Sequence, residues 1–161
     1  MNLTPLGVFH TSLSLVAVVS AIATLIKDRG VSPRSRVGRV YIWSLVATCL
    51  TGLPIFRHGA IGPPHVLGVL TLATFAVAAI AGKTQVFGRL SAYVETVSYW
   101  VTLLFLGIST VTETLTRVPP GAPIVASPEA PIFKPLYLAL LVLFLIGVTM
   151  QIKRLRTTVS A

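Results

Sequence analysis

The chain has 161 residues, of which 54% are hydrophobic and only 11% are charged, and its mean hydropathy is +0.87. This composition excludes an ordinary water-soluble domain and is typical of a polytopic membrane protein. A net charge of +9 would indicate a nucleic-acid partner for a soluble domain. Here we expect no nucleic acid, because basic residues orient a membrane protein and contact anionic lipid headgroups.

Five apolar runs are long enough, or nearly so, to cross a bilayer. No linker or internal repeat divides the chain, so we predict one domain over residues 1–161. The expected fold class is all-α, a single bundle of five transmembrane helices. The predicted spans cover residues 6–26, 40–56, 65–82, 90–111 and 132–152.

The basic residues predict the orientation of this bundle. Most of them follow the first, third or fifth run, and the first run has no basic residue before it, unlike a signal peptide. The positive-inside rule then predicts an N-terminus outside and a C-terminus inside, in the inner membrane of a cell. The expected inside residues are Lys27, Arg29, Arg34, Arg36, Arg39, Lys83, Arg89, Lys153, Arg154 and Arg156, which leaves Arg57, Arg117 and Lys134 outside.

Residues 117–131 form the longest predicted connection and contain five prolines. Proline has no N–H to donate and disrupts helices, so we expect this loop to lie extended on the outer surface. It either caps the outer end of the bundle or acts as an inert tether.

Small residues mark two helix faces that we expect to pack inside the bundle, because they let helices approach closely in lipid. Each face begins with a histidine. The first contains His10, Ser14, Ala17 and Ala21, and the second contains His65, Gly68, Leu72, Ala76 and Ala79.

The two histidines and Glu113 are expected at the outer end of the bundle, beside Arg57 and His58 of the adjoining loop. Two histidines on facing helices are what axial ligation of a b-type haem requires, so His10 and His65 are candidate haem ligands. With Glu113 they also suit zinc or copper, and a quinone headgroup is a further alternative. The competing interpretation is that each histidine caps or hydrogen-bonds a neighbouring helix end.

The fourth run carries polar residues on one face. Glu95 and Glu113 are 18 residues apart in the sequence, which places them about 27 Å apart along a helix, close to the thickness of a hydrocarbon core. Such a face must contact protein or water, and it is typical of a proton or cation path. The stripe contains Ser91, Glu95, Ser98, Thr102, Ser109 and Glu113.

A simpler interpretation of the stripe is that its hydroxyls pack while its carboxyls reach the two membrane interfaces. Glu113 would then pair with Arg117 or Arg57, and Glu95 with Arg39 or Lys83.

Other residue types give weaker signals. The single cysteine, Cys49, lies within the second run and is interpreted as packing. No set of residues combines a nucleophile, a base and oxyanion groups, so the sequence favours binding over catalysis. Most aromatic residues are expected near the ends of the spans, as in interfacial belts: Tyr41, Trp43, Tyr93, Tyr99, Trp100 and Tyr137.

Three short segments resemble a family of small bacterial predicted multi-pass membrane proteins of unknown function. They are residues 36–41 (Arg-Val-Gly-Arg-Val-Tyr), residues 62–65 (Gly-Pro-Pro-His) and Ser98–Tyr99. In that pattern His10 and His65 match two histidine positions, whereas Ser35 and Ser91 stand where two others would be. The resemblance implies a helical bundle in a bacterial membrane and no particular activity.

Three functions follow as hypotheses. The first is a non-enzymatic protein that binds b-type haem through His10 and His65, in electron transfer or an accessory role. The second is a proton- or cation-coupled transporter that uses Glu95, Ser98, Thr102, Ser109 and Glu113. The third is a structural subunit whose polar faces meet partner membrane subunits or a second copy of the chain.

Overall fold

The computed structural model of the protein describes residues 4–55 and 62–159, and in these residues all regular structure is helical. The element order is α1 (Pro5–Lys27), α2 (Arg36–Gly52), α3 (Pro63–Thr84), a 3₁₀ turn η1 (Gly88–Leu90), α4 (Ser91–Arg117) and α5 (Phe133–Val159). The predicted all-helical class is confirmed.

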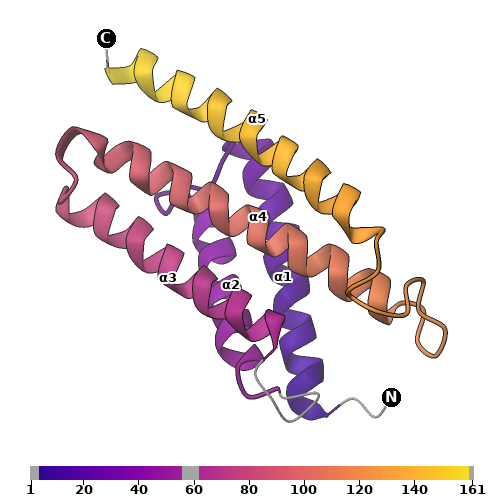
Figure 1. Ribbon diagram of the computed structural model, residues 1–161. Helices are drawn as coiled ribbons and strands as arrows, with labels where there is room; N and C mark the ends of the chain where they lie inside the picture. The colour runs from indigo at the N-terminus through magenta and orange to yellow at the C-terminus, as the bar shows by residue number, and fades with distance from the viewer. Residues whose placement is uncertain (1–3, 56–61, 160–161) are drawn as a thin grey trace.

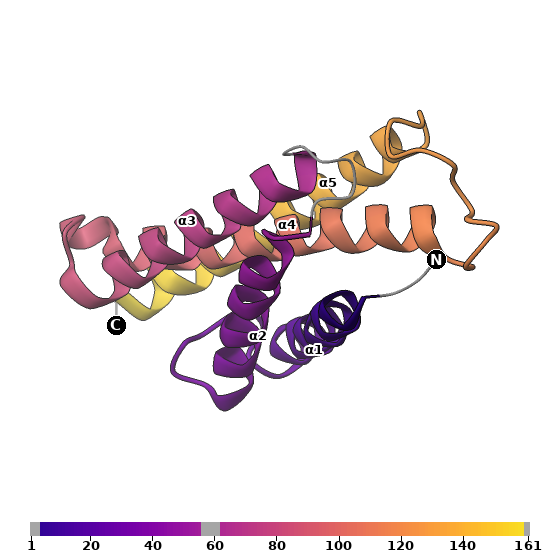
Figure 2. The same cartoon turned by 90° about the horizontal axis from the view of Figure 1, so that it is seen from below.

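The helices form two layers. Helices α3, α4 and α5 lie side by side in one layer, with α4 in the middle (Figure 1). The hairpin of α1 and α2 packs against one face of that layer, as Figure 2 shows from below. Helix α2 contacts α3, and α1 contacts α4. Helix α4 is therefore the central element, since it contacts α1, α3 and α5.

Local sequence explains where the first two helices begin. The Thr4 hydroxyl accepts a hydrogen bond from the Gly7 N–H at 3.1 Å, and Pro5 occupies the first position of α1, where its missing N–H costs nothing. Ser35 caps α2 by accepting from the Gly38 N–H at 2.9 Å. Gly38 is required there, because a Cβ atom would lie 2.0 Å from the Ser32 carbonyl oxygen.

Among the described residues, four helices are long and apolar enough to cross a membrane: α1, α3, α4 together with η1, and α5. Their length and composition support the predicted class of multi-pass membrane protein. Helix α2 has 17 residues. It begins at Arg36, four residues before the expected start of the second span, and residue 56 of that span lies outside the described residues.

The fourth and fifth helices are longer than expected. Helix α4 continues to Arg117, six residues past the predicted end at 111, and α5 continues to Val159 instead of 152. Both extensions are more polar than the apolar runs that defined the spans, so hydropathy alone underestimates these helices.

The proline-rich connection after α4 is folded in turns, which differs from the extended loop that we expected. Its Val125 is buried, and the Val125 N–H donates to the Leu115 carbonyl of α4 at 2.9 Å. The loop therefore folds back on the end of α4, because pairing there satisfies a carbonyl that the helix end leaves without a partner.

The core lies where α2, α3 and α4 meet. The ring of Phe75 lies between those of Tyr41 and Tyr99, with centroid distances of 6.3 and 6.2 Å. Tyr41 is fully buried and Tyr99 is 5% exposed, so the prediction that these two tyrosines belong to an interfacial belt is wrong. Aromatic rings bury more apolar area in the core than small residues do. The helices are therefore rotated so that Tyr41, Phe75 and Tyr99 face one another.

The same packing corrects one of the two small-residue faces. On α1 the predicted Ala17 and Ala21 are buried, as expected. On α3 the predicted Ala76 and Ala79 are exposed. The buried face of α3 is instead formed by Thr71, Phe75, Ala78 and Ala81.

Candidate functional site

The polar stripe of α4 is buried over much of its length and faces the other helices. Ser91, Ser98 and Thr102 are buried, and Thr102 is fully so. This confirms that the stripe contacts protein rather than lipid over this stretch. Ser109, further along the helix, is half-buried.

A contact between two hydroxyls occupies the middle of this stripe. The Tyr41 and Thr102 side-chain oxygens lie 2.9 Å apart, and both residues are fully buried. The Thr102 hydroxyl also donates to the Tyr99 carbonyl at 2.7 Å. Because a hydroxyl has one proton to give, the Tyr41 hydroxyl donates to Thr102.

Towards the start of α4, Glu95 pairs with an arginine from the α1–α2 loop. Arg34 Nη1 lies 3.4 Å from Glu95 Oε1, and the Glu95 side chain is 12% exposed while that of Arg34 is 72% exposed. Neither predicted partner, Arg39 or Lys83, forms an ion pair with Glu95 in the part of the chain that the structure describes. The prediction was wrong because the loop, which hydropathy does not place, brings Arg34 over the start of α4.

Helix α3 packs against this carboxylate at Gly82. A Cβ atom built on Gly82 would lie 2.6 Å from Glu95 Oε1, the oxygen that pairs with Arg34. The glycine therefore makes room for the carboxylate between α3 and α4. We call Arg34, Gly82 and Glu95 the Glu95 end of the site.

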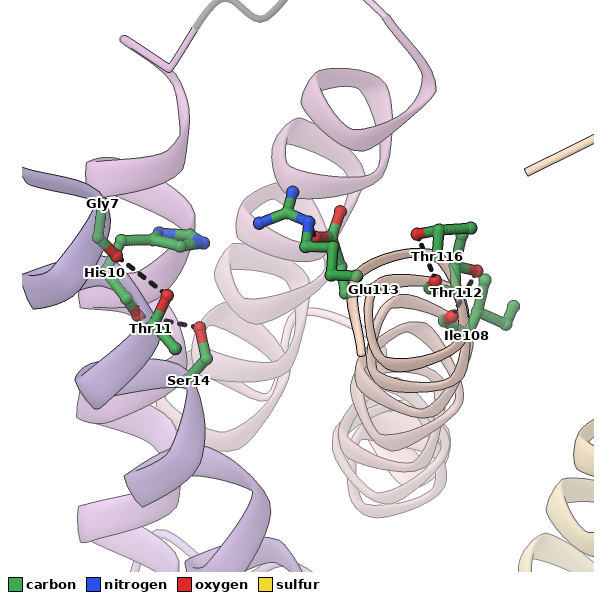
Figure 3. Close-up of polar contacts among 9 residues, drawn as sticks. Gly7, His10, Thr11, Ser14, Ile108, Thr112, Glu113 and Thr116 are labelled. Carbon is green, nitrogen blue, oxygen red and sulfur yellow. Dashed lines mark hydrogen bonds and ion pairs between the residues drawn. The ribbon is translucent and has the colours of Figure 1, made fainter. Parts of the chain in front are cut away.

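At the other end of α4, Glu113 forms an ion pair with Arg117 one turn later. This was one of the two predicted pairings; the alternative partner, Arg57, lies outside the described residues. Figure 3 shows the His10 ring pointing from α1 towards Glu113 on α4.

Hydrogen bonds fix the protonation pattern of His10. Its Nδ1 lies 3.1 Å from the Thr51 hydroxyl oxygen. That hydroxyl donates to the Ala47 carbonyl at 2.8 Å, so it accepts from His10 Nδ1–H. The neutral ring then keeps a lone pair on Nε2. Gly52 makes room for the ring, since a Cβ atom there would lie 3.0 Å from His10 Cε1. We call His10, Thr51, Glu113 and Arg117 the His10 end of the site.

His65 has the opposite pattern. Its Nδ1 accepts a hydrogen bond from the Gly62 N–H at 3.2 Å, which closes a capping box at the start of α3. The neutral ring therefore carries its proton on Nε2. The capping role is the competing interpretation of this histidine given above.

This pattern bears on the residues proposed for haem and metal. An axial ligand needs a lone pair, which His10 offers on Nε2 and His65, in this conformation, does not. Helices α1 and α3 also do not pack on each other within the described ranges. Among the described residues, no group of three or more His, Cys, Asp or Glu side chains is placed to hold a metal ion. Ligation by His10, His65 and Glu113 stays a prediction, and His58 lies outside the described residues.

Sequence reasoning missed four residues of the site: Arg34, Tyr41, Thr51 and Gly82. Tyr41 was assigned to an interfacial belt by its position near the end of a span. Thr51 and Gly82 carry no charge, so only the packing of α2 on α1 and of α3 on α4 shows their contacts.

Comparison of this chain with protein families, with curated proteins and with solved structures finds no match.

Proposed function

We propose that this protein conducts protons across a membrane along the polar seam, by which we mean the His10 end, the Tyr41–Thr102 contact and the Glu95 end taken together. One observation carries the proposal: ionisable groups lie at both ends of the stripe on α4, and buried hydroxyls lie between them. By helical rise Thr102 is about 10 Å from Glu95 and about 16 Å from Glu113. Ionisable side chains arranged in this way inside a membrane domain are typical of proton relays.

His10 is the proposed proton acceptor at its end. The bond to Thr51 leaves the lone pair of Nε2 available to accept a proton, and the ring points towards Glu113 on α4. The Glu113 carboxylate is itself paired with Arg117.

Glu95 is the proposed acceptor at the other end. Its carboxylate is almost covered by protein and is held by one exposed arginine. In the conformation described, the Tyr41–Thr102 contact closes the seam between the two ends. Proton passage then requires this contact to open and admit water.

The membrane arrangement is part of the same proposal. We propose five spans, with α2 as the fifth, because 17 residues of helix reach about 25 Å and α2 pairs with α1 along its length. The positive-inside rule places the His10 end outside and the Glu95 end inside, in the inner membrane of a bacterium.

The test is proton influx into proteoliposomes that contain a pH-sensitive dye, with a potassium diffusion potential as the driving force. Wild-type protein should raise the influx rate well above that of protein-free liposomes, and Glu95→Gln should remove at least nine-tenths of the increase. The matched control is Glu129→Gln, since Glu129 is an exposed carboxylate in the α4–α5 loop. An unchanged rate in Glu95→Gln would contradict the proposal.

Haem binding is the second candidate, and one observation favours it for His10. Metal-bound histidines usually donate their second ring N–H to a fixed acceptor, as His10 does to Thr51. His65 would have to leave its capping position to supply the second ligand. An absorption spectrum of the purified protein, oxidised and then reduced, tests this: a Soret band that His10→Ala abolishes would support it, and a featureless spectrum would oppose it.

A further inference from the structure

An apolar groove runs between α1 and α2 on the side of the hairpin away from His10. Its volume is about 510 Å³, and it is lined by Leu15, Val16, Val19, Ser20 and Ala23 of α1 and by Arg36, Val37 and Val40 of α2. This volume is within the range of roughly 300–1,000 Å³ that is usual for ligand sites. The groove shares no residue with the polar seam, so a ligand in the groove would not contact the residues proposed to carry protons.

The lining selects for a hydrocarbon ligand. Val16, Val19 and Val40 are 47–65% exposed and present only methyl groups. Ser20 is the one hydroxyl residue of the lining, and its hydroxyl donates to the Val16 carbonyl at 2.6 Å. Apart from Arg36, the walls therefore offer an alkyl chain apolar contact and no competing hydrogen-bond donor.

One charged residue, Arg36, lies at the end of this groove. It is exposed, it is the first residue of α2, and neither ion pair of the described residues uses it. Lys27 at the end of α1 and Arg39 in the first turn of α2 add positive charge at the same end of the hairpin. Basic pockets between membrane helices bind anionic lipid headgroups.

We propose that this groove binds one acyl chain of an anionic phospholipid, with the lipid phosphate on Arg36. The charge of the Arg36 end distinguishes this occupant from a zwitterionic lipid, and the apolar walls distinguish it from free phosphate. A helix from a second copy of the chain would fit the walls but would have to cover Arg36, at the cost of desolvating it.

Native mass spectrometry of the detergent-solubilised chain tests the proposal, with phosphatidylglycerol and phosphatidylcholine of identical acyl chains as probes. Wild-type protein should bind phosphatidylglycerol about fivefold more tightly, the factor expected from one arginine near an anionic lipid. Arg36→Gln should remove most of this preference, and Lys27 and Arg39 account for what is left. Val19→Trp, which fills the groove, should lower the occupancy of both lipids.

Two variants serve as matched controls: Arg89→Gln removes an exposed arginine in η1, and Val69→Trp enlarges an exposed valine of α3. Both should bind lipid as the wild type does. Equal affinity of the wild type for the two lipids, or equal loss in Arg36→Gln and Arg89→Gln, would overturn the proposal. A dimer that Val19→Trp converts to a monomer would also overturn it, because the occupant would then be a second copy.

Discussion

The two carboxylates of α4 are alike in the sequence and are held in different ways in the fold. Glu113 pairs with Arg117 on its own helix, so the pair moves with α4 as a unit. Glu95 pairs with Arg34 of the α1–α2 loop and lies against Gly82 of α3, so three separate elements meet at its carboxylate.

Under the proposed function, this difference favours the Glu95 end of the polar seam as the end that opens. A pair within one helix survives any rigid movement of that helix. The Glu95 pair breaks as soon as the loop moves, and with Arg34 72% exposed it contributes at most about 1 kcal/mol. The Glu95 pair therefore depends on the position of a loop, whereas the Glu113–Arg117 pair depends on α4 alone.

Substitution of Gly82 should have the largest effect on stability, because it breaks the Glu95 end. Gly82→Leu places a side chain where the Glu95 carboxylate lies, so we expect a loss of about 1–3 kcal/mol in the free energy of unfolding, as for overpacked sites. The measurement is chemical unfolding in mixed micelles. Gly68→Leu is the control, since no atom lies within 4 Å of a Cβ built there. Equal stability of the two variants would show that the carboxylate does not need this space.

Loss of the hydrogen bond between Tyr41 and Thr102, in the middle of the seam, should have an intermediate effect on stability. Tyr41→Phe removes one buried hydrogen bond, which typically contributes about 1 kcal/mol. In a Thr102→Val background the same change should cost clearly less, because its partner is already absent. The same unfolding assay measures all four proteins. Additive losses would mean that the two hydroxyls do not act on each other.

The effect on stability should be smallest at the His10 end. Thr51→Val removes the acceptor of His10 Nδ1–H, and we expect a loss of roughly 0.5 kcal/mol because the ring is half-exposed. The sharper signal is ¹⁵N NMR of the imidazole, in which the single Nδ1–H tautomer of the wild type should give way to a mixture. Thr74→Val is the control, since that hydroxyl bonds only within α3. A wild-type ring with its proton on Nε2 would refute the proposed acceptor.

The sequence predicts well those features that depend on one helix alone. The face of α4 with Ser98 and Thr102 follows from helical periodicity and the cost of polar groups in lipid, and the Glu113–Arg117 pair follows from spacing.

Features that depend on how two elements meet were not predictable in this way. The rotation of α3 is decided by Phe75 between two tyrosines of other helices, and the partner of Glu95 is decided by the path of a loop. The tautomers of His10 and His65 depend on Thr51 and on the backbone of Gly62. No pattern within α1 or α3 contains this information.

Whether the two ends belong to one path is tested most directly by a double-mutant comparison of proton influx into proteoliposomes. The rates of Glu95→Gln, His10→Ala and the double variant are compared with the wild-type rate. On one continuous path either block is enough, so the double variant should be no slower than the slower single variant. Multiplied losses, or a wild-type rate in either single variant, would contradict a single seam that links His10 to Glu95.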